Sequence, residues 1–160
     1  MLIRTRHGSV RVAAVILMSL LIASCGGDSS PMGPSEVPSF LTGTWRGTMT
    51  ISRTGEPDVT GPTAWTFQPA PQQPGGSAFQ ATIESQNPWL PITMISTTAL
   101  GPSPTPPTQI NSYGTYASPR GCRGDFGSAG DVQSRTIDAT FFGVDCNDQT
   151  FQGRVQLTKQ

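Results

Sequence analysis

The fold of this chain is constrained most by short runs in which apolar and polar residues alternate. Between residues 39 and 160, these runs are rich in Thr, aromatic and β-branched residues, and clusters of Gly, Pro, Asp and Asn separate them. In one of them, Ile137, Ala139 and Phe141 alternate with polar residues. Alternation with period two is typical of β-strands that bury one face. The sequence therefore predicts eight strands, at 42–53, 63–69, 77–85, 89–98, 109–116, 122–128, 135–145 and 150–158.

Eight strands with one apolar face each predict an all-β fold, because a closed sheet gathers those faces into one core. We expect a single antiparallel eight-stranded up-and-down barrel over residues 39–160, with a β-sandwich as the alternative. Thr, Gln and Arg occupy the other faces, so an integral outer-membrane barrel, which turns its apolar face to lipid, is excluded. The long connections are expected at 69–76, 101–108 and 129–134, all at the end where the first strand begins.

The N-terminal segment 1–24 has the pattern of a secretory signal peptide. Arg4, Arg6 and Arg11 form a basic stretch ahead of an apolar run. That run is about 12 residues long, which is too short for a hydrocarbon core that needs roughly 20. An exported protein is therefore expected.

The end of this segment, Ile22-Ala23-Ser24-Cys25, resembles the lipobox of bacterial lipoproteins. The resemblance implies cleavage before Cys25, acylation of Cys25 with chains such as palmitate, and a membrane as partner. An aspartate after the cysteine favours the inner membrane in that family. This chain has Gly26 there, which implies the outer membrane. Residues 25–38 would then be the lipidated cysteine and a flexible Gly/Ser/Pro-rich tether.

Charge and histidine content exclude several function classes. Loss of residues 1–24 would remove three of the ten basic residues and none of the ten acidic ones, so seven minus ten leaves a net charge of −3. Nucleic-acid binding is therefore not expected. His7 is the single histidine and leaves with the signal, which excludes His-based nucleophilic catalysis and His/Cys zinc sites. We expect no cofactor, no metal site and no enzymatic activity.

Paired carboxylates are the catalytic option that remains, as in glycosidases. The candidates are interpreted as residues in or beside turns, where Asp is common for local backbone reasons. The segment 145–148 is interpreted as a turn that closes the last hairpin rather than as a calcium loop. The acidic candidates are Asp125, Asp131, Asp138, Asp145 and Asp148.

Cys122 and Cys146 are the two cysteines left once Cys25 is acylated. In an exported protein they predict one disulfide. Their positions near the ends of the sixth and seventh predicted strands suggest a clasp across the open end of that hairpin.

The first predicted strand opens with Leu41-Thr42-Gly43-Thr44-Trp45-Arg46-Gly47, which resembles the Gly-x-Trp motif of lipocalins and the wider calycin families. The resemblance implies an eight-stranded barrel in which Trp45 plugs the closed end. It also implies a basic residue of the last strand, Arg154 or Lys159, packed over the ring. Avidin-type biotin binders start similarly, but Gly47 stands where they have an asparagine, so biotin binding is not expected.

Large side chains of the apolar faces are the candidate pocket or core. They would either fill the barrel or leave a slot for an apolar ligand. Three functions stay open: binding of an apolar ligand or partner by an anchored barrel, an interaction or inhibitor module that acts through its loops, and a carboxylate-based hydrolase. The candidate pocket or core residues are Trp45, Met49, Trp65, Phe67, Phe79, Trp89, Met94, Phe141 and Phe151.

Overall fold

The computed structural model describes residues 37–70, 79–102 and 106–160. The predicted signal peptide, Cys25 and the tether as far as residue 36 lie outside the described residues. Parts of the predicted loops 69–76 and 101–108 lie outside them as well. In the part of the chain that is described, no helix is long and apolar enough to cross a membrane.

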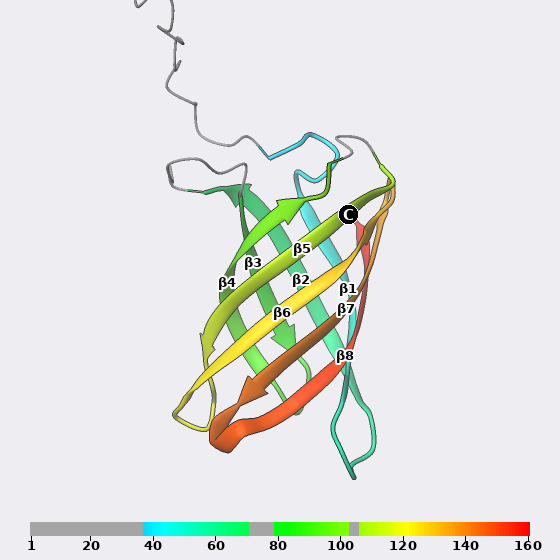
Figure 1. The fold of residues 1–160 in the computed structure, drawn as a ribbon. Helices are drawn as coiled ribbons and strands as arrows, with labels where there is room; N and C mark the ends of the chain where they lie inside the picture. Colours follow the sequence, from blue (N-terminus) through cyan, green and yellow to red (C-terminus); the bar gives the residue numbers. More distant parts are fainter. Residues whose placement is uncertain (1–36, 71–78, 103–105) are drawn as a thin grey trace, which may run out of the picture. The chain divides into compact units, whose positions relative to one another are not determined.

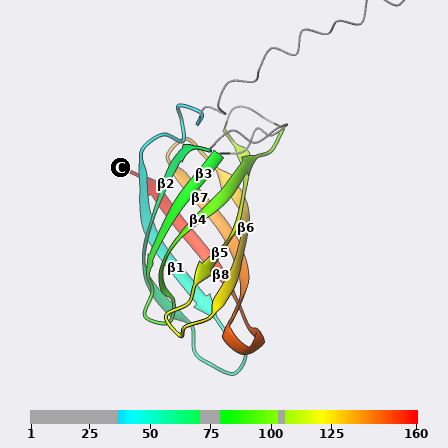
Figure 2. The same ribbon diagram turned by 90° about the vertical axis from the view of Figure 1, so that its left-hand side faces the viewer.

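Eight antiparallel strands form a closed up-and-down barrel in which each strand pairs with its neighbours in sequence and β8 pairs with β1 (Figures 1 and 2). The predicted fold class is confirmed, and the sandwich alternative is wrong. A 3₁₀ turn, η1 (Cys146–Asp148), joins the last two strands. The strands are β1 (Thr44–Ser52), β2 (Val59–Pro69), β3 (Phe79–Gln86), β4 (Pro91–Leu100), β5 (Thr108–Ala117), β6 (Arg123–Val132), β7 (Thr136–Asp145) and β8 (Gln149–Lys159).

The predicted loop at 129–134 is wrong. Strand β6 continues to Val132, and a short hairpin closed by Gln133 N–H donating to the Thr136 carbonyl follows it. Gly130 suggested a turn in the sequence, but it serves a close backbone approach. A Cβ at this position would lie 2.2 Å from the Asp138 carbonyl oxygen of β7, so no side chain fits there.

The end of the barrel where β1 begins, called here the upper end, is covered by the turn at 39–41 (Figure 1). Leu41, the last residue of this turn, is fully buried, and Trp45 Nε1 donates to the Leu41 carbonyl at 2.9 Å. Lys159 Nζ lies 5.8 Å from the Trp45 ring centroid and donates to the Phe40 carbonyl at 2.8 Å. The structure thus places Lys159, and not Arg154, over the Trp45 ring.

Candidate functional site

The nine side chains predicted to form a pocket or core all belong to the buried interior or pack against it. Trp89 is partly buried at the lower end, where β3 turns into β4. The other eight are at most 5% exposed: Trp45, Met49, Trp65, Phe67, Phe79, Met94, Phe141 and Phe151.

Aromatic rings form one chain of contacts through this interior. Neighbouring ring centroids lie 5.3 to 6.4 Å apart, a range in which edge-to-face and offset stacking are favourable. The chain starts at Trp45 under the upper end and reaches Trp89 at the lower end. Large side chains therefore occupy the barrel along its length. The contacts run through Trp45, Phe67, Trp65, Phe126, Phe141, Phe151 and Trp89, with Phe79 packed on Phe67.

Small hydroxyl residues line the interior on β4 and β5, which the sequence analysis did not single out. Ser96, Thr98 and Ser112 are at most 3% exposed. The Thr98 and Ser112 hydroxyls lie 2.8 Å apart, and Ser96 Oγ donates to the Ala81 carbonyl. These hydroxyls satisfy one another, whereas the fully buried Trp65 Nε1 has no acceptor among the described residues. The sequence could have indicated them, because they occupy the positions of the alternating pattern that face the interior.

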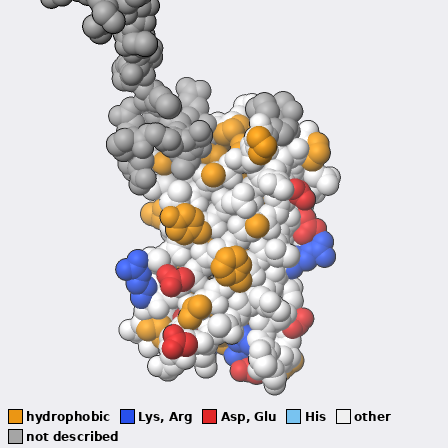
Figure 3. All heavy atoms as spheres, in the orientation of Figure 1, with side chains coloured by type: hydrophobic (Ala, Val, Ile, Leu, Met, Phe, Trp, Pro, Cys, Tyr) orange, Lys and Arg blue, Asp and Glu red, His pale blue; other side chains and the backbone are white. Residues whose placement is uncertain are grey.

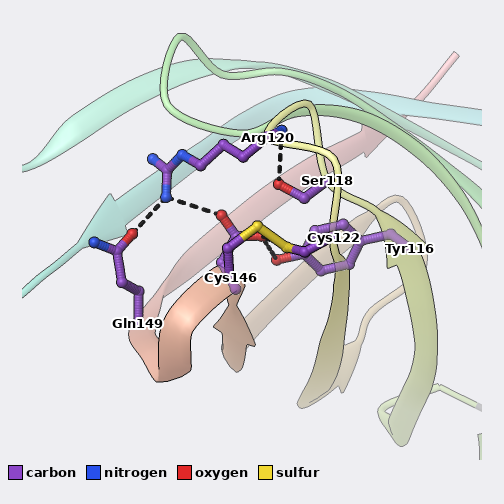
Figure 4. Close-up of a disulfide and its surroundings, with 7 residues drawn as sticks. Tyr116, Ser118, Arg120, Cys122, Cys146 and Gln149 are labelled. Carbon is purple, nitrogen blue, oxygen red and sulfur yellow. Dashed lines mark hydrogen bonds and ion pairs between the residues drawn. A yellow bond between two sulfur atoms is a disulfide. The ribbon is translucent and has the colours of Figure 1, made fainter.

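The lower end is organised around the disulfide between Cys122 and Cys146, whose Cα atoms lie 5.6 Å apart (Figure 4). Cys122 directly precedes β6, and Cys146 directly follows β7, so the bond closes the open end of this hairpin as the sequence suggested. Next to it, the buried Asp145 carboxylate accepts from Tyr116 Oη at 3.2 Å and from Arg120 at 3.0 Å.

This carboxylate does not make the lower end a metal site. Burial, followed by the Asp145 charge, raises the pKa of Tyr116 well above its usual value, so Tyr116 stays a proton donor. Asp145 and the two cysteine sulfurs lie within 4.8 Å of one another. However, the sulfurs are bonded to each other and offer no thiolate.

Trp89 and Asn87 close the lower end from the β3–β4 connection. The Arg53 and Arg120 guanidinium carbons lie 4.5 and 4.8 Å from the Trp89 ring centroid, which is cation–π geometry. Asn87 is fully buried, and its Nδ2 donates to the carbonyls of Met49 at 3.0 Å and Val59 at 2.8 Å. One side chain thus ties the β3–β4 turn to the β1–β2 hairpin.

Four of the five acidic candidates lie within strands, with Asp145 as the last residue of β7, so the interpretation of all five as residues in or beside turns is wrong. Asp125 and Asp131 are on β6 and Asp138 is on β7, and all three face solvent. Asp131 and Asp138 are direct cross-strand partners. Arg154 on β8 binds Asp138 through two hydrogen bonds, one of 2.7 Å from Nε. These bonds hold the pKa of Asp138 below its usual value.

Asp131 and Asp138 line a shallow outer hollow of about 460 Å³ over β6, β7 and β8. Ala129 and Gly130 also line it, and neither residue carries a side chain large enough to fill the space. We call it the polar hollow, after its remaining lining residues, Asp131, Gln133, Thr136, Asp138, Thr140 and Arg154.

Two aromatic side chains stand exposed on the same outer face. Tyr113 on β5 is 70% exposed and Phe142 on β7 is 67% exposed. Both pair in register with Gly127 of β6, which lies between them. Figure 3 views this face and shows separate hydrophobic side chains at its centre, with charged groups toward the margins. We call Tyr113, Gly127 and Phe142 the aromatic row.

Phe142 lies flat enough to cover Gly127. A Cβ on Gly127 would lie 2.9 Å from the far end of the Phe142 ring, so a larger residue there would displace the ring from this position. Thr140, which lines the polar hollow, precedes Phe142 by two residues on β7, so the two side chains lie on the same face of the sheet. The aromatic row and the polar hollow are therefore adjacent. Phe142 was not predicted from the sequence as a functional residue. The sequence did carry a signal, because Phe142 directly follows the inward-facing Phe141 and therefore belongs to the outward-facing, mostly polar positions of the strand.

Comparisons with protein-family models, with curated proteins and with solved structures gave no match for this chain.

Proposed function

We propose that this protein is a lipid-anchored lipoprotein of the cell envelope, in the outer membrane, whose small barrel binds a partner through its outer surface without catalysis. The observation that supports binding at the outer surface is a contrast in burial. Large aromatic side chains occupy the interior, whereas Tyr113 and Phe142 are 70% and 67% exposed on rigid strands. Exposed aromatic residues at fixed positions are typical of recognition surfaces.

A non-catalytic role is supported by the state of the acidic pair. A glycosidase-type mechanism needs one carboxyl group that keeps a proton near neutral pH. Arg154 lowers the pKa of Asp138, which favours the ionised form instead. Both Asp131 and Asp138 also lie on the solvent-facing side of the sheet, where water is not excluded.

An apolar ligand inside the barrel is the second candidate function. One observation favours it: Trp65 Nε1 is buried in the interior and has no acceptor among the described residues. A saturable site can be sought by titrating the protein with an apolar naphthalene sulfonate dye and following dye fluorescence. If the protein binds its partner through the outer surface, the dye should show no saturable one-to-one binding that changes when Trp65 is replaced by Phe. A one-to-one site altered by Trp65→Phe would make the protein a carrier.

The anchor is tested by Cys25→Ala in cells, with the membrane and soluble fractions probed separately. The proposal predicts that the wild type sediments with membranes and that the variant does not, because two or more acyl chains are what hold such a protein stably. Ser24→Ala is the matched control, since it keeps a small residue beside Cys25. Persistent membrane association of Cys25→Ala would overturn the anchor.

A further inference from the structure

We propose that the outer face of β5 to β8 is a binding surface for a neutral polysaccharide, with the aromatic row as its platform and the polar hollow as its hydrogen-bonding edge. This assignment rests on the proposed function, in which the outer surface binds the partner, and it names the class of that partner. A polysaccharide is the occupant that matches both neighbouring features, the flat apolar rings and the dense set of polar groups beside them.

The aromatic row supplies flat apolar surfaces in fixed positions. The faces of sugar rings carry C–H groups, which pack against aromatic faces because those faces are electron-rich. Tyr113 and Phe142 are on strands separated only by β6, so their backbones are about 10 Å apart. The Phe142 ring extends over Gly127 of β6, the strand that lies between β5 and β7. The platform is wider than one sugar ring, which favours a chain over a monosaccharide.

The polar hollow supplies the groups that sugar hydroxyls require. A hydroxyl both donates and accepts, so it is best matched by acceptors and donors set side by side. Asp138 and Arg154 form such a combination, held in place by their two mutual hydrogen bonds. Asp131 adds a further acceptor directly across from Asp138. Because Thr140 and Phe142 share one face of β7, a chain stacked on the aromatic row extends into the hollow.

The charge of the surface selects a neutral chain. Arg154 compensates one of the two carboxylates that face the hollow, and Asp131 remains as negative charge. An anionic polymer would be repelled by the Asp131 carboxylate. It would also be repelled by the net negative charge of the protein, since the chain without residues 1–24 has seven basic and ten acidic residues. Like charges at such a contact are unfavourable. The hydroxyl groups of a neutral sugar carry no charge and are not repelled by these carboxylates.

The test is isothermal titration calorimetry of the full chain, purified in a detergent without a sugar headgroup, with cellohexaose and chitohexaose as probes. Four proteins are compared: the wild type, Phe142→Leu, Phe142→Trp and Ile95→Ala. Leucine keeps apolar area and removes the flat face, whereas tryptophan keeps the flat face. Ile95 is the matched control, since it is 56% exposed on β4 and has no ring. Circular dichroism melting shows that each variant is folded.

We expect saturable binding of at least one hexasaccharide, a loss of about tenfold in affinity for Phe142→Leu, and wild-type affinity for Phe142→Trp and Ile95→Ala. Absence of saturable binding of both probes at millimolar concentration would overturn the assignment. So would equal affinity of Phe142→Leu and wild type.

Sedimentation velocity on the same samples checks the other occupants. Self-association that Phe142→Leu abolishes, without binding of either probe, would assign the face to a second copy and overturn the proposal. Failure with both sugars leaves the proposed function standing if Cys25→Ala still frees the chain from membranes and the dye finds no interior site. The two failures are thus distinguishable.

Discussion

Removal of the disulfide through the double substitution Cys122→Ala, Cys146→Ala should destabilise the barrel by an amount that follows from its loop. The two cysteines are 24 residues apart in sequence. Closing a loop of about 25 residues in the unfolded chain corresponds to about 3.5 kcal/mol at 25 °C in the chain-entropy account. The neighbouring contacts need not be lost, because Tyr116 and Arg120 bind the Asp145 side chain independently of the sulfurs.

Urea unfolding followed by circular dichroism at 25 °C measures this loss directly. For a domain of this size, about 3.5 kcal/mol also corresponds to a fall of roughly 10 to 15 °C in Tm. Cys25→Ala is the control, because it removes a cysteine and leaves the disulfide intact. The wild type treated with dithiothreitol should unfold like the double variant.

Two outcomes would refute this reasoning. A double variant within about 0.5 kcal/mol of the wild type would behave like an ordinary surface substitution, and the disulfide would then contribute nothing to stability. A normal loss in the double variant with no effect of dithiothreitol on the wild type would mean that the loss comes from the side chains and not from the bond.

Three further predictions concern the core, a buried polar link and the outer ion pair. Trp45→Ala should lower the free energy of unfolding by about 3 to 5 kcal/mol in guanidinium titrations, and Trp45→Phe by less; an unchanged value would show that Trp45 does not support the core. Asn87→Ala should cost about 2 to 4 kcal/mol by calorimetric melting, because the Met49 and Val59 carbonyls lose their donor; a neutral result would contradict the link between the two turns. The hydrogen bonds from Arg154 hold the pKa of Asp138 below its usual value, so the stability that this ion pair contributes is present above about pH 4 and is lost as pH falls through the lower folded pKa. The difference in Tm between wild type and Asp138→Asn should therefore shrink below pH 4, and a difference that grows on acidification would reverse the assigned sign.

The number and order of the strands were predictable because a half-buried strand leaves a period-two pattern in its own residues. Ile137, Ala139 and Phe141 identify β7 without reference to any other strand. The ends of the strands were harder to predict. Gly130 suggested a turn because glycine is common in turns, whereas its actual role is to let two backbones approach. Composition does not distinguish these two roles.

Contacts that depend on the register of pairing were not predictable. Asp131 and Asp138 become neighbours only because β6 and β7 pair with a three-residue hairpin between them, and the sequence suggested a longer loop there. Asn87 reaches Met49 and Val59 because the β3–β4 turn folds against a different hairpin. The exposure of Phe142 was predictable, since an aromatic residue at an outward-facing, otherwise polar position of a strand is expected to be exposed.

Native mass spectrometry of the protein purified from cells that express the full chain is the most direct test of the proposal that a filled, lipid-anchored barrel acts through its outer surface. We expect a chain that begins at an acylated Cys25, lacks two hydrogens because of the disulfide, and carries no bound apolar molecule. A small apolar molecule that stays bound under gentle ionisation and is lost when the barrel unfolds would contradict this proposal, because such a molecule would be enclosed inside the barrel.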